Sequence, residues 1–289
     1  MKPAPFDYYA PNTVEEACTL LAEAGGGATI IAGGQTLMPL LALRMSQPFI
    51  LVDITRIPAL RAVSRANAIT RIGPALRQND ALVDPTLAQA QPLIVTALGH
   101  VGHHQTRNRG TVGGSIALGE PAAELPATAV ALGASVEVRS VRGSRRIAAT
   151  ELYLGPYATA LEPDELITAI DVPEWPPGTV VLFRELARRP GDFALVGLTG
   201  VLAIKDGRIE RAGIAWLGMG PTPIKARQVE AMLVGQSITD LDVRAASELA
   251  VADTAPFDDL HATAEYRRTV GRRVFARALG EALNLRLAA

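Results

Sequence analysis

The first part of the chain alternates between helical periodicity and short apolar runs. Residues 13–24 repeat apolar side chains at helical spacing, start with a Thr13–Glu16 capping pair, and stop at a run of glycines. Short apolar runs predict buried strands over residues 28–31 and 49–54, with a helical turn over 37–45 between them. This order predicts a small α/β lobe over residues 1–55.

A longer series of the same elements follows and ends at a clear break. It contains predicted strands over 68–72, 135–139 and 165–172, and predicted helices over 93–101 and 122–132. The break is EWPPG at 174–178, because two prolines and a glycine cannot continue a strand or a helix. We therefore predict a second α/β lobe over residues 56–175.

The last part of the chain predicts an antiparallel sheet followed by helices. Two apolar runs, 196–204 and 209–218, flank Asp206-Gly207, which is a strong signal for a tight hairpin turn. Helical patterns then cover residues 223–233, 242–251 and 265–285. The whole chain is thus predicted to be an α+β protein, with a C-terminal α+β domain over residues 179–289 behind the two lobes.

Two glycine-rich segments, AGGQT at 32–36 and TVGGS at 111–115, carry the main chemical signal. Adjacent glycines allow positive φ and let a bulky anion approach the backbone, and successive amides then form an anion-binding cradle. Two such cradles indicate a pyrophosphate that is held from both sides, and hence a dinucleotide. Neither loop fits the GxGxxG pattern of nicotinamide-type folds, and the GxxxxGK[ST] pattern is absent, so FAD is the leading ligand.

Composition excludes several other classes of function. The net charge is −1 over 289 residues, which gives no basis for a nucleic-acid surface or an anionic membrane surface. Cys18 is the single cysteine, so the chain forms no internal disulfide and ligates no iron–sulfur cluster, and the four histidines lack metal-ligand spacing. No apolar run is long enough to cross a bilayer and the N-terminus has no signal-peptide pattern, so we expect a cytoplasmic protein.

Six segments carry a resemblance to a known family: AGGQTLMP at 32–39, RNRGTVGGS at 107–115, PAAELP at 121–126, TALEPDELI at 159–167, RRPGDFA at 188–194 and AEYRR at 264–268. In this order they resemble the FAD-binding medium subunit of the molybdenum hydroxylases, the family of xanthine dehydrogenase and carbon monoxide dehydrogenase. The resemblance implies a PCMH-type FAD-binding domain made of the two lobes, followed by a CO-dehydrogenase-type flavoprotein domain. It also implies an oxidoreductase in which a large partner subunit carries the molybdenum cofactor and a small one carries two [2Fe-2S] clusters, assembled as a dimer of heterotrimers.

The resemblance also implies which residues hold FAD, and it implies no catalytic residue or metal ligand in this chain. The pyrophosphate would be bound from one lobe by Ala32, Gly33, Gly34, Gln35 and Thr36, and clamped from the other by Thr111, Gly113, Gly114 and Ser115. Glu124 would lie near the adenosine half, Leu166 or Ile167 would pack against the flavin or its ribityl chain, Arg188 would face the flavin pyrimidine edge, and Phe193 would lie near the isoalloxazine. The chain departs from the family at Leu118-Gly119-Glu120, where many relatives have His-Ala-Asp, so a polar contact from Leu118 is left open.

Taken together, these features indicate an FAD-binding electron-transfer subunit that passes electrons from partner clusters to an external acceptor. The acceptor stays open among quinone, cytochrome, oxygen and NAD. Alternatives are an autonomous flavin oxidase or reductase with the same FAD grip, and a scaffold that has lost its cofactor, against which the intact glycines argue. At residue level, Arg107, Arg109 and Arg188 can equally be loop charges, and Glu124 a carboxylate that is stabilised at a helix N-terminus.

Overall fold

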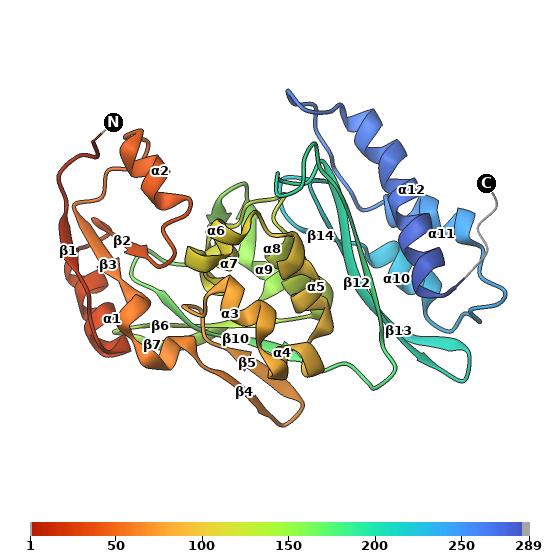
Figure 1. Cartoon of the computed structure of the whole chain (residues 1–289), viewed down its shortest axis with the longest axis horizontal. Coiled ribbons are helices and arrows are strands. Elements are labelled where there is room, and N and C mark those ends of the chain that lie inside the picture. Colours follow the sequence, from red (N-terminus) through yellow and green to blue (C-terminus); the bar gives the residue numbers. More distant parts are fainter. Residues whose placement is uncertain (1, 285–289) are drawn as a thin grey trace.

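The computed structural model describes residues 2–284, which form three adjoining units, each built on a β-sheet (Figure 1). The N-terminal unit lies at the left of the view, the middle unit at its centre, and the C-terminal sheet and helices at its right. No helix in residues 2–284 combines the length and the apolar character that a membrane crossing requires.

The N-terminal unit is a three-stranded parallel sheet with strand order β1-β3-β2. Its elements are β1 (Asp7–Tyr9), α1 (Val14–Glu23), β2 (Ala28–Ile31), α2 (Leu37–Ala42) and β3 (Ile50–Asp53). The predicted helix cap is confirmed, since the Thr13 hydroxyl accepts from the Glu16 amide at 3.1 Å. β1 was not predicted, because its three residues are exposed and only pairing with β3 defines them as a strand.

The middle unit is a five-stranded antiparallel sheet, order β4-β5-β10-β6-β7, with helices packed against it. Its strands are β4 (Val63–Ala66), β5 (Ile69–Ile72), β6 (Ser135–Ser140), β7 (Gly143–Ala148), the β8 (Tyr153–Gly155) and β9 (Ala158–Thr159) pair, and β10 (Leu166–Pro173). Its helices are α3 (Gln78–Val83), α4 (Pro85–Ala90), α5 (Pro92–His100), α6 (His104–Arg109), α7 (Val112–Leu118), α8 (Glu124–Leu132) and α9 (Ala149–Leu152). Every residue of α8 is buried, including Glu124 and Thr128, because α8 contacts α5 and α7 as well as β12 and β13.

The C-terminal unit is an antiparallel sheet, order β11-β12-β13-β14, covered by three helices. Its elements are β11 (Val180–Leu186), β12 (Val196–Lys205), β13 (Arg208–Leu217), β14 (Ile224–Lys225), α10 (Arg227–Leu233), α11 (Val243–Ala250) and α12 (Ala264–Ala282). The predicted hairpin is confirmed, with φ of 50° at Asp206 and 72° at Gly207, as its turn type requires. The helix predicted from 223 is wrong at its start, because residues 224–225 pair with β13 instead; residue 285, the predicted end of the last helix, lies outside the described residues.

The middle and C-terminal units share one hydrophobic core. Val201, Ala215 and Leu217 of the C-terminal sheet belong to the same buried cluster as the apolar residues of α8. Side chains on the other face of that sheet pack with α10, α11 and α12, around the fully buried Trp216. The proposed division of the chain at 174–178 therefore separates two sheets but not two cores.

Candidate functional site

Both glycine-rich loops line a single cleft of about 390 Å³, to which all three units contribute residues. The cleft brings together these residues predicted for the site: Ala32, Gly33, Gly34, Gln35, Thr36, Thr111, Gly113, Gly114, Ser115, Glu124, Leu166, Ile167 and Phe193. Arg188 is not part of its lining. Loops that are about 80 residues apart in sequence thus face one space, as the sequence interpretation requires.

The first loop, residues 32–36 between β2 and α2, presents free backbone amides. Within residues 2–284, the amides of Gly33, Gly34, Gln35 and Thr36 have no hydrogen-bond acceptor in the protein. Gly34 adopts φ of 70°, and Thr36 occupies the N-cap position of α2 without making a side-chain cap. Free amides ahead of a helix N-terminus carry partial positive charge, so this loop has the donors that an anion-binding cradle needs.

In the second loop, residues 111–115 at the start of α7, the amides of residues 112–115 all donate to acceptors within the protein. The Val112 amide donates to the Leu76 carbonyl at 3.0 Å, and the Gly113 amide donates to the Pro74 carbonyl at 2.9 Å. The Gly114 amide donates to the Thr111 hydroxyl at 3.0 Å, and the Ser115 amide to the Thr111 carbonyl at 3.3 Å. The expectation of a second amide cradle is therefore wrong, although the loop does line the cleft; the Ser115 hydroxyl, which has no partner among the described residues, remains available as a donor.

Two of the glycines are needed for close packing between segments of the protein. A Cβ on Gly33 would lie 2.6 Å from the Arg109 carbonyl oxygen and 2.7 Å from the Gly110 Cα. A Cβ on Gly113 would lie 2.7 Å from the Pro74 carbonyl oxygen. The sequence interpretation assigned these glycines to phosphate approach, whereas the structure shows backbone of the middle unit in that space. Gly33 thus lets the first two units meet at the cleft.

Two buried carboxyl groups lie in the wall behind the second loop. Glu124, the first residue of α8, is 4 % exposed, and burial first and the nearby Glu120 second raise its pKa to about 7. Glu120 also lines the cleft, and its carboxylate accepts from the Ala122 amide at 3.0 Å and from the Tyr157 hydroxyl. Sequence reasoning considered only Leu118 in this segment and missed Glu120, although a carboxylate directly ahead of PAAELP was a usable signal.

Gln78 is a second residue of the cleft that sequence reasoning missed. Its side chain is buried with the residue only 5 % exposed, and it donates weakly to the Thr111 carbonyl at 3.5 Å. Its Oε1 is buried and has no partner within residues 2–284. Buried polar atoms are normally satisfied, so Oε1 is a candidate acceptor for a bound molecule. No local sequence pattern distinguishes this glutamine from a surface one.

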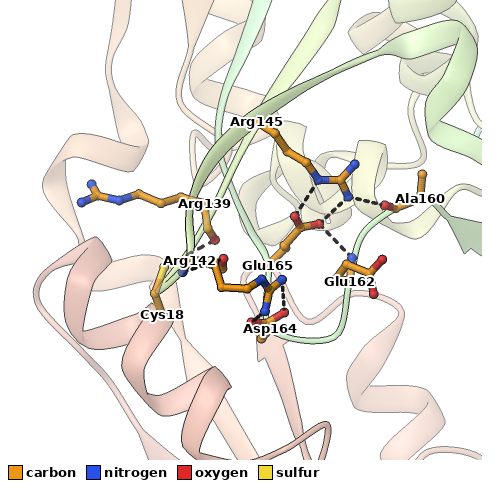
Figure 2. Close-up of polar contacts among 9 residues, drawn as sticks. Cys18, Arg139, Arg142, Arg145, Ala160, Glu162, Asp164 and Glu165 are labelled. Carbon is orange, nitrogen blue, oxygen red and sulfur yellow. Dashed lines mark hydrogen bonds and ion pairs between the residues drawn. The ribbon is translucent and has the colours of Figure 1, made fainter.

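An arginine of β7 fixes the wall that contains Leu161, Leu166 and Ile167. Arg145 makes two hydrogen bonds to the Glu165 carboxylate, at 2.7 and 2.8 Å, and a third to the Ala160 carbonyl at 2.8 Å (Figure 2). Glu165 also accepts from the Glu162 amide at 2.9 Å, which closes the turn. The Arg145 hydrogen bond holds the pKa of Glu165 below its ordinary value. The ionised pair therefore positions the apolar wall of the cleft, and Glu165 acts as a turn-forming charge.

Phe193 and the arginines named in the sequence lie in different settings. Phe193 lies between β11 and β12, lines the cleft, and is 60 % exposed. Arg188 donates to the Leu260 carbonyl at 3.5 Å, so its approach to a flavin edge stays a prediction. Arg107 donates to the carbonyls of Val101 and Gly102, so it stabilises the loop ahead of its own helix.

Comparison with family models decides the family of the chain. Residues 4–175 match the model described as the FAD binding domain in molybdopterin dehydrogenase, and residues 181–282 match the CO dehydrogenase flavoprotein C-terminal domain. The chain belongs to the molybdenum hydroxylase medium-subunit family. Membership places it among FAD-binding subunits of oxidoreductases, as the resemblance implied.

Relatives of this medium subunit match it from end to end. The chain is 39% identical over 285 residues to the 6-hydroxypseudooxynicotine dehydrogenase complex subunit alpha of Paenarthrobacter nicotinovorans, with 98% of this chain and 96% of that protein covered. It is 34% identical to the carbon monoxide dehydrogenase medium chain of Hydrogenophaga pseudoflava, with 98% of each covered. The solved carbon monoxide dehydrogenase of the same organism superposes with a TM-score of 0.95 at 36% identity over 98% of this chain and 99% of that one. Quinoline 2-oxidoreductase of Pseudomonas putida 86 gives 0.92 at 34% identity over 98% and 99%.

The chemistry of the cleft in this medium subunit fits FAD. A pyrophosphate needs backbone donors, which the free amides of Gly33 to Thr36 supply. The flavin ring needs apolar contacts, which Leu161, Leu166, Ile167 and the exposed Phe193 supply. Hydroxyl and amine groups of the adenosine half can pair with the buried polar atoms of Glu124, Glu120 and Gln78.

Proposed function

We propose that this chain is the FAD-binding electron-transfer subunit of a molybdenum-containing hydroxylase or dehydrogenase. It passes electrons from two [2Fe-2S] clusters of a small partner subunit to an external acceptor, while a large partner subunit holds the molybdenum cofactor. The observation that carries the proposal is the loop 32–36, which has free amides and lines one cleft together with the loop 111–115. The single cysteine, Cys18, is buried, so the clusters have to lie on other chains.

Each wall of the cleft has a proposed role toward FAD. Ala32, Gly33, Gly34, Gln35 and Thr36 hold the pyrophosphate through backbone amides, and Thr111, Gly113, Gly114 and Ser115 close over it, with the Ser115 hydroxyl as donor. Glu124 faces the adenosine half, where a pKa of about 7 lets its carboxyl group both accept and donate near neutral pH. Leu166, Ile167 and Phe193 contact the flavin, and Arg188 supplies positive charge toward its pyrimidine edge.

The residues of the chain bind and orient FAD rather than react. When bound, FAD supplies the capacity to take up electrons singly and to release two of them. The loop 32–36 fixes the phosphate end, and the wall held by Arg145 and Glu165 fixes the position of the ring relative to the protein surface. The proposal assigns no nucleophile and no general acid to this chain.

The proposal is tested by the flavin content of the purified full chain. We expect the wild-type chain to retain stoichiometric FAD, and Gly33→Val to lose it, because the branched side chain would collide with the Arg109–Gly110 backbone and open the cleft. Gly99→Ala, at an exposed glycine with free space around its Cα, is the matched control and should retain FAD. The ratio of flavin absorbance in the visible to protein absorbance in the ultraviolet measures the FAD content, and identification of the released nucleotide confirms that it is FAD. Full FAD content in Gly33→Val would contradict the assignment of the loop.

The electron-transfer role is tested by assembly and turnover. We expect the chain to co-purify with a cysteine-rich polypeptide and a molybdenum-bearing one, at the mass of a dimer of heterotrimers by light scattering. The assembled protein should oxidise its organic substrate, whereas the isolated chain with FAD should oxidise none. Turnover by the isolated chain would instead support an autonomous flavin oxidase or reductase.

A further inference from the structure

Arg267 of α12 is a buried cation that joins three separate segments of the C-terminal unit. The residue is 4 % exposed, and its guanidinium donates to the carbonyls of Leu195 and Gly218, the latter at 2.9 Å. Its second amino group donates to the Asp259 carboxylate at 2.7 Å. Its buried Nε has no partner among the described residues, so the two terminal amino groups make all of its hydrogen bonds. A buried guanidinium is costly unless its donors are satisfied, so these three bonds have to be kept in one geometry.

Two of the segments that Arg267 joins reach the FAD cleft. Leu195 lies two residues after Phe193, which lines the cleft. The Gly218 amide donates to the Pro121 carbonyl at 3.0 Å, next to Glu120 in the cleft wall. A Cβ on Gly218 would lie 2.9 Å from the Leu195 carbonyl oxygen, so the two turns are in close contact. Arg267 therefore connects the Phe193 loop with the part of the cleft wall around Glu120 without lining the cleft itself.

The far end of the Phe193 loop is fixed by the middle unit. Gly191 adopts φ of 86°, and a Cβ there would lie 2.6 Å from the His103 ring. The Asp192 amide donates to the Arg189 carbonyl at 3.1 Å, which closes the turn ahead of Phe193. The loop is thus fixed at Gly191 and at Leu195, while the ring between these points is 60 % exposed. An exposed ring has little packing of its own to hold it, so its position depends on the two ends of the loop.

We propose that Arg267 is a positioning residue that holds Phe193 over the bound flavin. This inference rests on the proposed function, because it assumes FAD in the cleft. Arginine suits the task better than lysine, since its planar group presents several donors in fixed directions and here reaches two carbonyls and one carboxylate at once. The Leu195 amide is held separately, since it donates to the Leu186 carbonyl at 2.8 Å. Loss of the Arg267 bonds therefore leaves the Leu195 carbonyl without its guanidinium donor and loosens the Phe193 side of the loop.

The test compares how well iodide quenches the fluorescence of FAD in the purified full chain. Arg267→Met should retain FAD and raise the quenching constant severalfold, and Arg267→Lys should raise it less. Arg268→Met removes the neighbouring exposed charge and is the matched control, so it should leave the constant unchanged. Phe193→Ala should itself raise the constant, and Arg267→Met should add nothing in that background, because the arginine acts through the ring.

Several outcomes separate the two hypotheses. An unchanged quenching constant in Arg267→Met, or an equal further rise in the Phe193→Ala background, would overturn the positioning role while the proposed function stands. Absence of FAD from the wild-type chain would instead refute the proposed function. If Arg267→Met does not fold, Asp259→Asn decides, because it leaves both carbonyl contacts of Arg267 in place. The remaining carbonyl oxygen can still accept from the His261 and Ala262 amides, as Oδ1 of Asp259 does, and the change falls on Oδ2, which accepts from the guanidinium. That variant should give a smaller rise in the same direction, and no rise would overturn the positioning role.

Discussion

The loops at 32–36 and 111–115 share a glycine pair and a hydroxyl residue, yet they use their backbone differently. The first loop keeps the amides of Gly33 to Thr36 free toward the cleft. The second loop bonds its amides to Pro74, Leu76 and Thr111 and is thereby fixed to the middle unit. One loop therefore has unused donors at the cleft, whereas the amides of the other serve to fix it to the middle unit.

The difference shows that adjacent glycines do not by themselves identify a phosphate contact. A glycine is required wherever something approaches its Cα, and that something can be an anion or another backbone. At Gly33 and Gly113 the approaching group is the backbone of a neighbouring segment. Hydrogen-bond satisfaction of the amides, rather than the glycine pair, distinguishes the two cases.

The largest expected effect is on stability, and it distinguishes Gly113, which packs inside one unit, from Gly33, which lies between two units. Gly113→Ala should lower the free energy of unfolding by about 3 kcal/mol, because its methyl would overlap the Pro74 backbone inside one unit. Gly33→Ala should lower it less but weaken FAD binding more, because its methyl acts at the contact between two units. Urea denaturation of the FAD-free chain and titration with FAD measure the two quantities. The comparison would be broken if Gly113→Ala kept wild-type stability and lost FAD.

The two loops also differ in the charge of their surroundings. The first loop has free amide donors, whereas the wall behind the second loop contains the buried carboxyl groups of Glu120 and Glu124. The pKa of Glu124 rises from 4.5 to about 7 on folding, so the folded chain binds this proton more tightly than the unfolded chain. The stability from this group is fully present below pH 4.5 and is lost as pH rises through about 7. In the FAD-free chain, the free energy of unfolding should therefore fall by about 2 kcal/mol less in Glu124→Gln than in wild type as pH rises through this range.

A second buried carboxyl group, Glu185, also changes its ionisation in this pH experiment. Burial first, and Glu124 second, raise the pKa of Glu185 to about 8, so it adds a loss of stability in the same direction at higher pH. Glu185 is present in both proteins but loses its charged neighbour in Glu124→Gln, so the difference between wild type and variant from pH 5 to pH 8 reports Glu124 together with its effect on Glu185. Parallel stability curves over that range would show that Glu124 does not change its ionisation on folding.

The smallest expected effect uses the threonines at equivalent places in the two loops. Thr111→Val should cost about 1 kcal/mol of stability, because the Thr111 hydroxyl caps α7 through the Gly114 amide. Thr36→Val should leave the stability of the FAD-free chain unchanged, because Thr36 makes no side-chain cap. It keeps the backbone amide but removes the Thr36 hydroxyl as a further donor to the pyrophosphate, so it should weaken FAD binding about fivefold. Thermal unfolding with and without FAD checks both. Equal destabilisation by the two variants would remove the distinction between the loops.

Much of the fold was accessible from local patterns. The capped helix at 14–23, the strand at 28–31 and the hairpin around Asp206-Gly207 lie where the sequence predicted them, because each depends on near neighbours in the chain. β1 and β14 were missed, since each is a short edge strand that its partner strand defines. The shared core of the middle and C-terminal units was also not predicted, because α8 is buried by contacts from both sides.

The sequence alone determined the family, the glycine loops and a set of site residues that, except for Arg188, all line the cleft, because these follow from residue types in a fixed order. Only the tertiary structure decided which amides remain free, that Gln78 and Glu120 join the cleft, and that Arg267 reaches Leu195 from α12. The reason is physical: whether a donor is available depends on which acceptors come within hydrogen-bond distance. Those acceptors come from segments that are far away along the chain.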